Sequence, residues 1–233
     1  MRALILNSGM GKRMGDITDN HPKCMTYISK DETILSRQLK KLCQCGIDKV
    51  IMTTGYFDKV LVNYCKELKI NINYSFIKND IYYKTNYIYS IYLAREYLND
   101  DIILMHGDLV FEIDILKKML DYNKSCMSIS TTNPLPKKDF KAVIKDNKIK
   151  KIGIEFFENA VTAQPLYKIN RLDWKVWLDE IIFYCENKKV SCYAENAFNK
   201  VSEECDIYPL DFNNKICIEI DTPEDLELVK NKL

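Results

Sequence analysis

Apolar residues recur along the chain in two patterns, short continuous runs and helical spacing, which alternate over the first 120 residues. Short apolar runs bounded by polar residues or glycine indicate buried strands, and apolar residues three or four positions apart indicate helices. The strands predicted in this way are 2–6, 49–53, 71–76 and 101–106, and the helices are 33–46, 58–68 and 86–98. Such alternation is typical of a mostly parallel sheet with helices on its faces.

After Met127 the regular alternation gives way to shorter apolar segments. Residues 140–144 and 148–154 flank the turn Lys145-Asp146-Asn147 and predict a hairpin added to the main sheet. Thr222-Pro223-Glu224-Asp225 predicts the start of a C-terminal helix, because Thr can cap it, Pro suits its first turn and the acids oppose its dipole. The further elements predicted in this half are a helix at 172–185 and strands at 190–193 and 215–220.

Charge and composition restrict the partners and the location of the protein. The 34 Lys and Arg nearly balance the 33 Asp and Glu, so the net charge of +1 favours neither a nucleic-acid partner nor membrane insertion. The N-terminal apolar run is much shorter than a signal sequence or a membrane span, which predicts a cytoplasmic protein. The nine cysteines lack the paired spacing of zinc sites, which favours reduced thiols. Because no linker or repeat interrupts the chain, we expect one domain over residues 1–233.

A glycine loop follows the first predicted strand. It reads Asn7-Ser8-Gly9-Met10-Gly11-Lys12-Arg13, and Pro22-Lys23 follows shortly after it. Two glycines let the main chain approach phosphates closely, and the N–H groups of such a loop, with the basic side chains, can hold a triphosphate. The glycines alone fit an ordinary strand-to-loop turn equally well. A dinucleotide-binding oxidoreductase would need a third glycine where this chain has Met14.

Acidic residues follow two of the later predicted strands. Asp108 comes directly after the strand at 101–106, at the carboxyl edge where open α/β sheets bind ligands. Glu219 and Asp221 are two residues apart at the end of a strand, so both carboxylates can face one cation from the same side. Each acid alone also fits a turn or a helix cap, so the interpretation depends on their combination with the glycine loop.

Taken together, the strand, the Gly-x-Gly-x-Arg-Met loop and the Pro-Lys-x-Met segment resemble the signature of the sugar-phosphate nucleotidyltransferase superfamily. The resemblance implies that the glycine loop and Arg13 wrap the nucleotide phosphates and that Lys23 contacts the reacting phosphate. It further implies that Asp108 and Asp221 hold Mg²⁺, with Glu219 as a supporting ligand. The residues that it assigns to catalysis are Lys23, Arg13 and Asp108.

The resemblance also implies a fold. We expect an α/β protein with a single Rossmann-like, GT-A-like nucleotidyltransferase domain. Its mostly parallel, mixed sheet would be flanked by helices and carry a small β extension. Residues 1–125 would form the nucleotide-binding half, and residues 126–233 would form the acceptor-binding half.

A narrower resemblance concerns Asn79 and the segment from Asn86 to Ser90, which is similar to a helix start in bacterial phosphocholine cytidylyltransferases. There the Asn and Ser lie near the acceptor and the metal-bound phosphates. The structural alternative is a Tyr-rich amphipathic helix capped by Asn86. The nucleotide-binding residues that the resemblance implies are Asn7, Ser8, Gly9, Met10, Gly11, Lys12, Arg13, Lys23, Asn79, Asn86 and Ser90.

The stretch Tyr193-Ala194-Glu195-Asn196 departs from the choline-specific relatives, which resemble Tyr-Trp-Asp-Asn and box the quaternary ammonium with the Trp. Ala194 cannot supply that wall, whereas Glu195 could neutralise an amine and Tyr167 could replace the aromatic ring. The acceptor-binding residues predicted on this basis are Tyr167, Glu195 and Asn196. Phosphocholine, aminoethylphosphonate and phosphorylated amino acids all stay open as acceptors.

These resemblances therefore imply a Mg²⁺-dependent cytidylyltransferase of the EC 2.7.7 class. It would transfer the cytidylyl group of CTP to a small phosphorylated or phosphonate acceptor, release pyrophosphate, and serve the decoration of cell-surface glycans or lipids. A homodimer is compatible with the sequence. Two alternatives stay open: a sugar-1-phosphate nucleotidyltransferase that uses another NTP, and a non-catalytic nucleotide-binding regulatory module.

Overall fold

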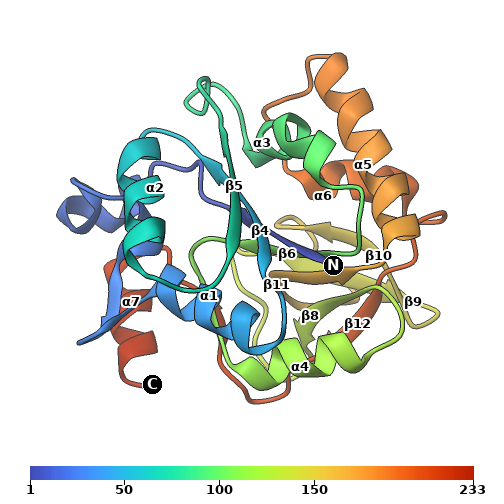
Figure 1. Cartoon of the computed structure of the whole chain (residues 1–233). Helices are drawn as coiled ribbons and strands as arrows, with labels where there is room; N and C mark the ends of the chain where they lie inside the picture. Colours follow the sequence, from blue (N-terminus) through green and yellow to red (C-terminus); the bar gives the residue numbers. More distant parts are fainter.

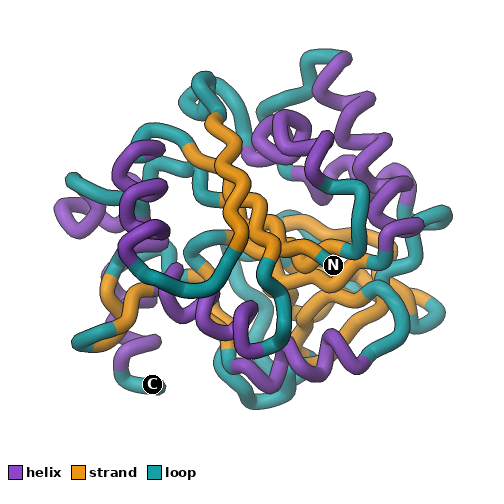
Figure 2. The backbone as a smooth tube through the Cα atoms, in the orientation of Figure 1, coloured by secondary structure: helices purple, strands orange, loops and turns teal.

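A nine-stranded mixed sheet forms the centre of the molecule, with helices on both of its faces (Figure 1). The computed structural model describes residues 1–233. Figure 2 shows the strands gathered in the middle and the helices around them. The parallel part of the sheet consists of β1 (Arg2–Leu6), β4 (Lys49–Thr54), β5 (Asn73–Lys78) and β6 (Ile102–His106), with β1 between β4 and β6. The predicted parallel core is confirmed.

The other part of the sheet is built around one long strand, β11 (Ala160–Ile169), which pairs antiparallel with β6, β8 and β9. Its neighbours are β8 (Cys126–Ser130), β9 (Lys141–Lys145), β10 (Lys148–Gly153) and β12 (Tyr208–Asp211). β9 and β10 form the predicted hairpin at the edge of the sheet. Sequence periodicity missed β11 because the strand is buried along most of its length and so does not alternate.

Two helical layers cover the sheet. The first layer contains α1 (Ile34–Gln44), α2 (Asp58–Glu67) and α4 (Ile113–Asp121), which bury apolar residues against one face. The second contains α3 (Tyr87–Ala94), α5 (Arg171–Glu186) and α6 (Ala194–Val201), which pack on the other face. None of the helices is both long and apolar enough to cross a lipid bilayer.

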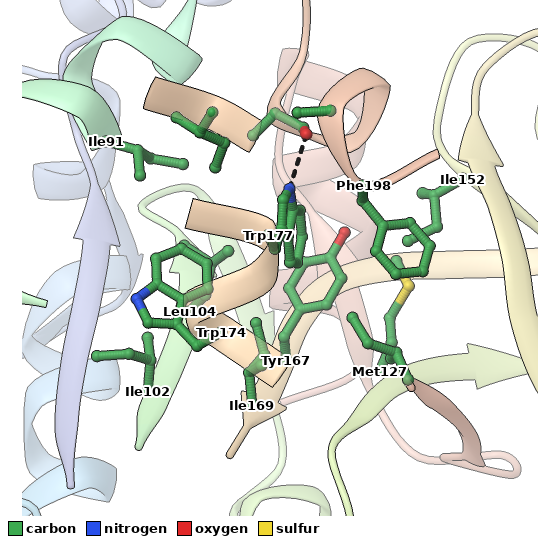
Figure 3. Packing of buried hydrophobic residues seen from close by; sticks show 14 of the residues in the cluster. Ile91, Ile102, Leu104, Met127, Ile152, Tyr167, Ile169, Trp174, Trp177 and Phe198 are labelled. Atoms are coloured by element: carbon green, nitrogen blue, oxygen red, sulfur yellow. Dashed lines mark hydrogen bonds between the residues drawn. The ribbon is translucent and has the colours of Figure 1, made fainter. Parts of the chain in front are cut away.

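The core beneath α5 is aromatic (Figure 3). Trp174 and Trp177 lie edge to face with ring centroids 5.7 Å apart, and Tyr167 and Phe198 pack on Trp177. The indole N–H of Trp177 donates to the main-chain oxygen of Ala194 at 2.9 Å. Ala194 is fully buried in this cluster, so its small size serves packing between α5 and α6 rather than the shape of an acceptor pocket.

The predicted strand at 190–193 is wrong. These residues form a loop that leads into α6, and Tyr193 occupies the N-cap position of that helix. The main-chain N–H of Tyr193 donates to Oδ1 of Asn196 at 2.9 Å, which satisfies a donor at the helix start. A local capping interaction therefore overrides the short apolar run that indicated a strand.

Two small sheets complete the fold beside the main one. β2 (Tyr27–Ser29) pairs with β3 (Glu32–Thr33), and β7 (Leu109–Phe111) pairs antiparallel with β13 (Cys217–Glu219). The predicted C-terminal helix is α7 (Pro223–Lys230), which begins in a capping box between Thr222 and Asp225. Short 3₁₀ turns occupy Lys12–Thr18, Lys23–Met25 and Arg95–Tyr97.

Candidate active site

The carboxyl ends of β1 and β6 bring two distant loops together. Leu6 and His106 are register partners at these ends, and the N–H of Gly107 donates to the main-chain oxygen of Leu6 at 3.0 Å. The loop after β1 contains the glycine motif, and the loop after β6 contains Asp108. Parallel strands therefore place both predicted motifs at one edge of the sheet, where α/β proteins bind ligands.

β13 and α7 bring Asp221 to the same edge of the sheet. β13 pairs with β7, which follows Asp108, and the N–H of Ile220 donates to the main-chain oxygen of Asp108 at 3.0 Å. The N–H of Asp221 donates to Oδ2 of Asp225 at 3.0 Å, so the start of α7 holds the Asp221 backbone. Asp108 and Asp221, 113 residues apart, thus become neighbours.

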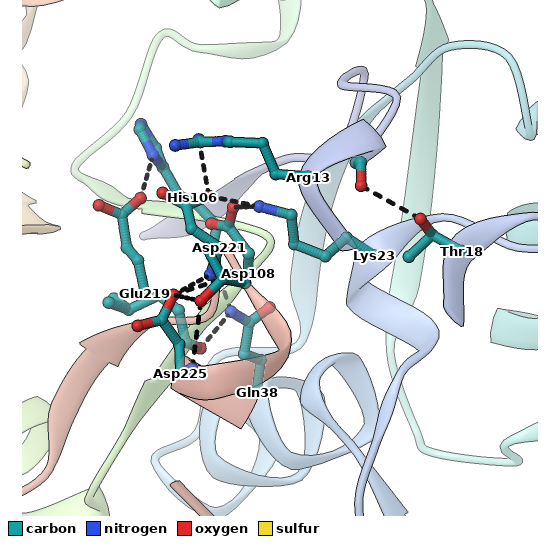
Figure 4. Close-up of polar contacts among 12 residues, drawn as sticks. Arg13, Thr18, Lys23, Gln38, His106, Asp108, Glu219, Asp221 and Asp225 are labelled. Atoms are coloured by element: carbon teal, nitrogen blue, oxygen red, sulfur yellow. Dashed lines mark hydrogen bonds and ion pairs between the residues drawn. The ribbon is translucent and has the colours of Figure 1, made fainter. Parts of the chain in front are cut away.

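One lysine joins the two acids (Figure 4). The Nζ atom of Lys23 lies 2.7 Å from Oδ2 of Asp108 and 2.6 Å from Oδ1 of Asp221. Arg13 adds an ion pair with Asp221 at 2.8 Å. Both carboxylates therefore converge on a single cationic group, and the four predicted residues form one cluster.

The charges in this cluster sustain each other's ionised forms. Burial acts to lower the pKa of Lys23, but the carboxylates of Asp108 and Asp221 outweigh it and raise that pKa. Burial acts to raise the pKa of Asp108, and the positive charge of Lys23 outweighs it, so this pKa lies below its usual value. At neutral pH, Lys23 is therefore an ammonium group and Asp108 a carboxylate.

The acids also fit a divalent metal ion. Oδ1 of Asp108 is buried and has no hydrogen-bond partner, although Oδ2 is bonded to Lys23. Carboxylate oxygens are the ligands that Mg²⁺ prefers. Candidate ligand atoms of His106, Asp108 and Glu219 lie within 4.8 Å of one another. Asp108 and Glu219 thus provide oxygen donors at one place together with His106, and Asp221 is joined to Asp108 through Lys23.

His106 is a site residue that the sequence analysis missed. Its Nδ1 lies 2.8 Å from Oε1 of Glu219, and burial, which acts to lower its pKa, is outweighed by Glu219, so that the pKa rises to about 9. The sequence feature that could have identified His106 is its position two residues before Asp108, at the end of an apolar strand.

The first cavity of the site has a volume of about 360 Å³ and lies over the glycine loop. Lys12, Arg13 and Lys23 supply positive charge to its wall, and Asp108 lies at its border. Gly11 has φ of +66°, a conformation that favours glycine, and a Cβ at this position would lie 3.3 Å from Cβ of Lys23. The further lining residues are Leu6, Asn7, Gly9, Met10, Gly11, Pro22, Cys24 and Gly107. The cavity has the form and charge of a polyphosphate site.

Three predicted nucleotide-binding residues form a buried network. The hydroxyl groups of Ser8 and Ser90 are 2.7 Å apart, and the amide of Asn79 donates to the Ser90 hydroxyl at 3.0 Å and to the Thr85 hydroxyl at 3.0 Å. Asn79 and Ser90 are each only 1% exposed. They hold the glycine loop against α3 rather than lining the cavity. Asn86 caps α3 and lines two neighbouring cavities.

A second cavity of about 240 Å³ adjoins the first, and Arg13 and Asp108 line both. Its walls include the aromatic rings of Tyr87, Phe140 and Tyr193. The Phe140 and Tyr193 centroids are 5.3 Å apart, and those of Tyr87 and Tyr193 are 5.8 Å apart. The cavity is also lined by acidic groups, among them Asp139, Glu219 and Asp221, and by the basic side chains of Arg13, His106 and Lys138. Aromatic faces beside carboxylates suit a cationic group.

Tyr167, Glu195 and Asn196, which the sequence predicts to bind the acceptor, are not among the residues that line this cavity. Tyr167 is 0% and Glu195 1% exposed, and the hydroxyl groups of Tyr167 and Tyr87 both donate to the Glu195 carboxylate. Asn196 uses its side chain to cap α6 at Tyr193. The three residues form a layer behind the aromatic wall, because buried polar groups of this kind are satisfied within the protein. Tyr87, Phe140 and Tyr193 line the cavity in their place.

Comparison with known proteins places the chain in a family. The MobA-like NTP transferase domain matches residues 3–132. The chain is 31% identical over 127 residues to a CTP:phosphoglutamine cytidylyltransferase of Campylobacter jejuni, covering 52% of this chain and 49% of that protein. It is 29% identical to a CMP-5'-(3-aminopropyl)phosphonate synthase of Streptomyces rubellomurinus, covering 51% of this chain and 19% of that protein. The chain thus spans about half or less of these two relatives.

Other relatives match over the whole chain. A choline-phosphate cytidylyltransferase of Streptococcus pneumoniae is 26% identical and is covered completely, as is this chain. The solved structure of a CTP:phosphocholine cytidylyltransferase from S. pneumoniae has the same fold, with a TM-score of 0.77, 21% identity and coverage of 99% and 98%. The solved structure confirms the predicted α/β fold, and because the MobA-like domain matches more than half of the chain, the protein belongs to the MobA-like NTP transferase family.

Proposed function

We propose that the protein transfers the cytidylyl group of CTP to a small phosphorylated or phosphonate acceptor that carries an amine. The observation that carries this proposal is the pair of adjoining cavities with Arg13 and Asp108 between them. One cavity has the cations that a triphosphate requires, and the other has aromatic and acidic walls. The names of the relatives, which include three cytidylyl- or CMP-transferring enzymes, support CTP as the donor.

In the proposed reaction, an oxygen of the acceptor's phosphate or phosphonate attacks the α-phosphorus of CTP, and the bond to the β-phosphate oxygen breaks to release pyrophosphate. The acceptor oxygen is already anionic, so no general base is required. Lys23 and Arg13 would neutralise charge that develops on the phosphoryl oxygens, and the loop would orient the triphosphate. Mg²⁺ held by Asp108 and Asp221, with support from Glu219, would supply further charge neutralisation.

We further propose that residues 1–125 hold the nucleotide and that residues 126–233 supply most of the acceptor site. Phe140, Tyr193 and Glu219 of the second half line the acceptor cavity. Tyr87 and His106 of the first half line it as well. The acceptor would therefore lie between the two halves rather than within the second one.

The amine in the proposed acceptor follows from the aromatic wall. A cation beside aromatic rings gains roughly 0.5–2 kcal/mol, equivalent to up to about thirtyfold in affinity. The wall is formed by Tyr87, Phe140 and Tyr193, so Ala194 does not weaken it. We expect phosphocholine, phosphoethanolamine, aminoethylphosphonate and phosphorylated amino acids to be better acceptors than sugar phosphates that carry no amine.

Pyrophosphate release tests the proposal directly. Each NTP is incubated with Mg²⁺ and with each of these acceptors, and glucose 1-phosphate serves as the acceptor without an amine. Release with CTP and an amine-bearing acceptor, at a kcat/KM at least tenfold above that for glucose 1-phosphate, is expected. A preference for glucose 1-phosphate with another NTP would refute it in favour of a sugar-phosphate enzyme. No release with any pair, together with nucleotide binding, would indicate a regulatory module.

A further inference from the structure

Lys141, the first residue of β9, is a fully buried lysine that forms no ion pair. Its Nζ donates to the main-chain oxygens of Pro136 at 2.7 Å and of Asp139 at 3.1 Å. The ring of Phe157 faces the same ammonium group, with Nζ 4.2 Å from the ring centroid. A lysine ammonium group has three N–H donors, so two carbonyls and one aromatic face can satisfy all of them.

A charged group at this position is unfavourable for stability. An ammonium group that leaves water without an opposite charge beside it destabilises the folded state. Burial lowers the pKa of Lys141, and the carboxylates of Asp139 and Glu155 offset this effect only in part. An apolar side chain could fill the same space without this cost. The role of Lys141 must therefore be sought in the groups that its ammonium group holds.

Lys141 makes the only hydrogen bonds that hold residues 135–139, the loop before β9. This segment contains no helix or strand, and no other main-chain or side-chain group of the protein donates to it or accepts from it. The next contacts along the chain lie outside the segment, where Thr162 donates to Pro134 and Ala163 donates to Phe140. The conformation of the loop therefore depends on one side chain.

The contacts of Lys141 reach two segments that border the second cavity. Residues 138–140, at the end of the loop before β9, line this cavity. Because β9 and β10 pair antiparallel with Lys141 opposite Gly153, the loop after β10 leaves the hairpin at the same end. That second loop contains Phe157, and its residue Ile154 lines the same cavity. One buried ammonium group thus joins two loops that both contribute to the proposed acceptor site.

We propose that Lys141 is a positioning residue for the acceptor, which holds the loop of residues 135–139 against the second cavity without touching the acceptor itself. The inference rests on the proposed function, because it requires that the acceptor occupies this cavity. Lys141 would fix the places of the Asp139 carboxylate and the Phe140 ring beside the acceptor. The effect should be confined to the acceptor, because no residue of this loop lines the glycine-loop cavity.

Lys141→Met tests the proposal, because methionine is unbranched and of similar length but has no charge and no donor. For the best of the amine-bearing acceptors named above, KM from pyrophosphate release should rise about fivefold or more, with little change in kcat, because the loop no longer has a fixed position. The affinity for CTP with Mg²⁺, measured by calorimetry, should stay the same. Lys145→Met, at an exposed lysine of the same strand, is the matched control and should change none of these values.

Trypsin measures the hold of Lys141 on the loop without any substrate. Lys137 and Lys138 are exposed in the loop, and cleavage after them is identified from the masses of the fragments. In Lys141→Met that is folded by circular dichroism, this cleavage should be about fivefold faster than in the wild type, since the local unfolding of the loop becomes easier. Lys145→Met should be cleaved in the loop at the wild-type rate.

Phe157→Leu is the second variant and removes the aromatic cover of the ammonium group while both of its hydrogen bonds stay. It should change the acceptor KM and the loop cleavage in the same direction as Lys141→Met, by smaller factors. Phe156→Leu is its control, because the Phe156 ring faces Lys151 instead.

An unchanged acceptor KM in folded Lys141→Met would overturn the inference, and a lower melting temperature alone would assign Lys141 a purely structural role. An equal loss of CTP affinity would overturn it as well, since the effect would not be confined to the acceptor. Unchanged trypsin cleavage of the loop would refute the hold of Lys141 on the loop. A wild-type protein that uses none of the acceptors would instead refute the proposed function, so the two failures are distinguishable.

Discussion

At the scale of single residues, Lys23 is the centre of the site. Its ammonium group contacts both Asp108 and Asp221, and its side chain is only 12% exposed. A buried charge of this kind is costly unless it is paired, and here two carboxylates pair it. In the proposed reaction, a nucleotide with its metal ion would offer new partners to all three groups, so Lys23 would reach the reacting phosphate without losing an ionic partner.

The first prediction concerns Lys23→Met. If Lys23 stabilises charge mainly in the transition state, the variant should lose about 10²-fold in kcat and much less in the KM for CTP. Steady-state pyrophosphate release measures both constants. Lys12→Met removes an exposed lysine of the same loop and should reduce kcat far less. A change confined to KM would show that Lys23 only binds the ground state.

At the scale of elements, the C-terminal helix α7 keeps Asp221 in position. α7 packs Leu226 and Val229 into a small apolar cluster with Met14 and Ile220. Met14 follows the glycine loop and Ile220 precedes Asp221, so the cluster connects the phosphate loop with the acid. The packing of α7 therefore helps to fix the position of Asp221 relative to the glycine loop.

The second prediction concerns the cap of α7. The Thr222 hydroxyl accepts from the Asp225 N–H, and its loss in Thr222→Ala should lower the free energy of unfolding by about 1 kcal/mol. Urea denaturation followed by circular dichroism measures the change. Glu224→Ala, at an exposed position in the same turn, should cost clearly less. Equal losses in the two variants would mean that the cap contributes little.

The third prediction compares two tryptophans on α5. Both indoles are buried, but the N–H of Trp177 donates to Ala194 whereas that of Trp174 has no partner. Trp177→Phe should therefore be less stable than Trp174→Phe by about 1 kcal/mol, the usual contribution of one hydrogen bond. Urea midpoints of the two variants test this. A larger loss of stability for Trp174→Phe would mean that the hydrogen bond of Trp177 is not the main difference between the two tryptophans.

At the scale of the whole molecule, the site is assembled from both halves of the chain. The parallel strands carry the glycine loop and Asp108, whereas Phe140 precedes β9, Tyr193 caps α6 and Asp221 follows β13. Ligands bound there would contact both halves and bind only to the folded protein. Binding should therefore stabilise the fold as a unit.

The fourth prediction follows from this linkage. CTP with Mg²⁺ at about a hundred times its dissociation constant should add about 2.7 kcal/mol to the free energy of unfolding and raise the melting temperature. Removal of Mg²⁺ with EDTA should abolish most of this increase, because Asp108 and Asp221 would then repel the triphosphate. Thermal scans with CTP, with Mg²⁺ alone and with both measure the effect. An equal increase without metal would contradict the assignment of the acids.

The parallel core and the main motifs could be predicted from the sequence. Strand 2–6 and the C-terminal helix were found because apolar runs, caps and glycines act locally. The carboxyl-edge rule for parallel sheets also allowed Asp108 to be placed beside the glycine loop. Local physics was sufficient for these features, since each depends on neighbours close in the chain or on a general rule of sheet geometry.

The tertiary structure determines which residues form the aromatic wall of the second cavity and which residues lie behind it. Tyr87 and Tyr193 are 106 residues apart and meet only because α3 and α6 pack on the same face of the sheet. The sequence predicts that Glu195 binds an amine. In the fold, however, its carboxylate is buried and accepts hydrogen bonds from the hydroxyl groups of Tyr87 and Tyr167. In the same way, only the register of β1 and β6 places Asn7 against Gly107. Sequence determined which chemical groups were present, and long-range packing determined which of them face a ligand and which face each other.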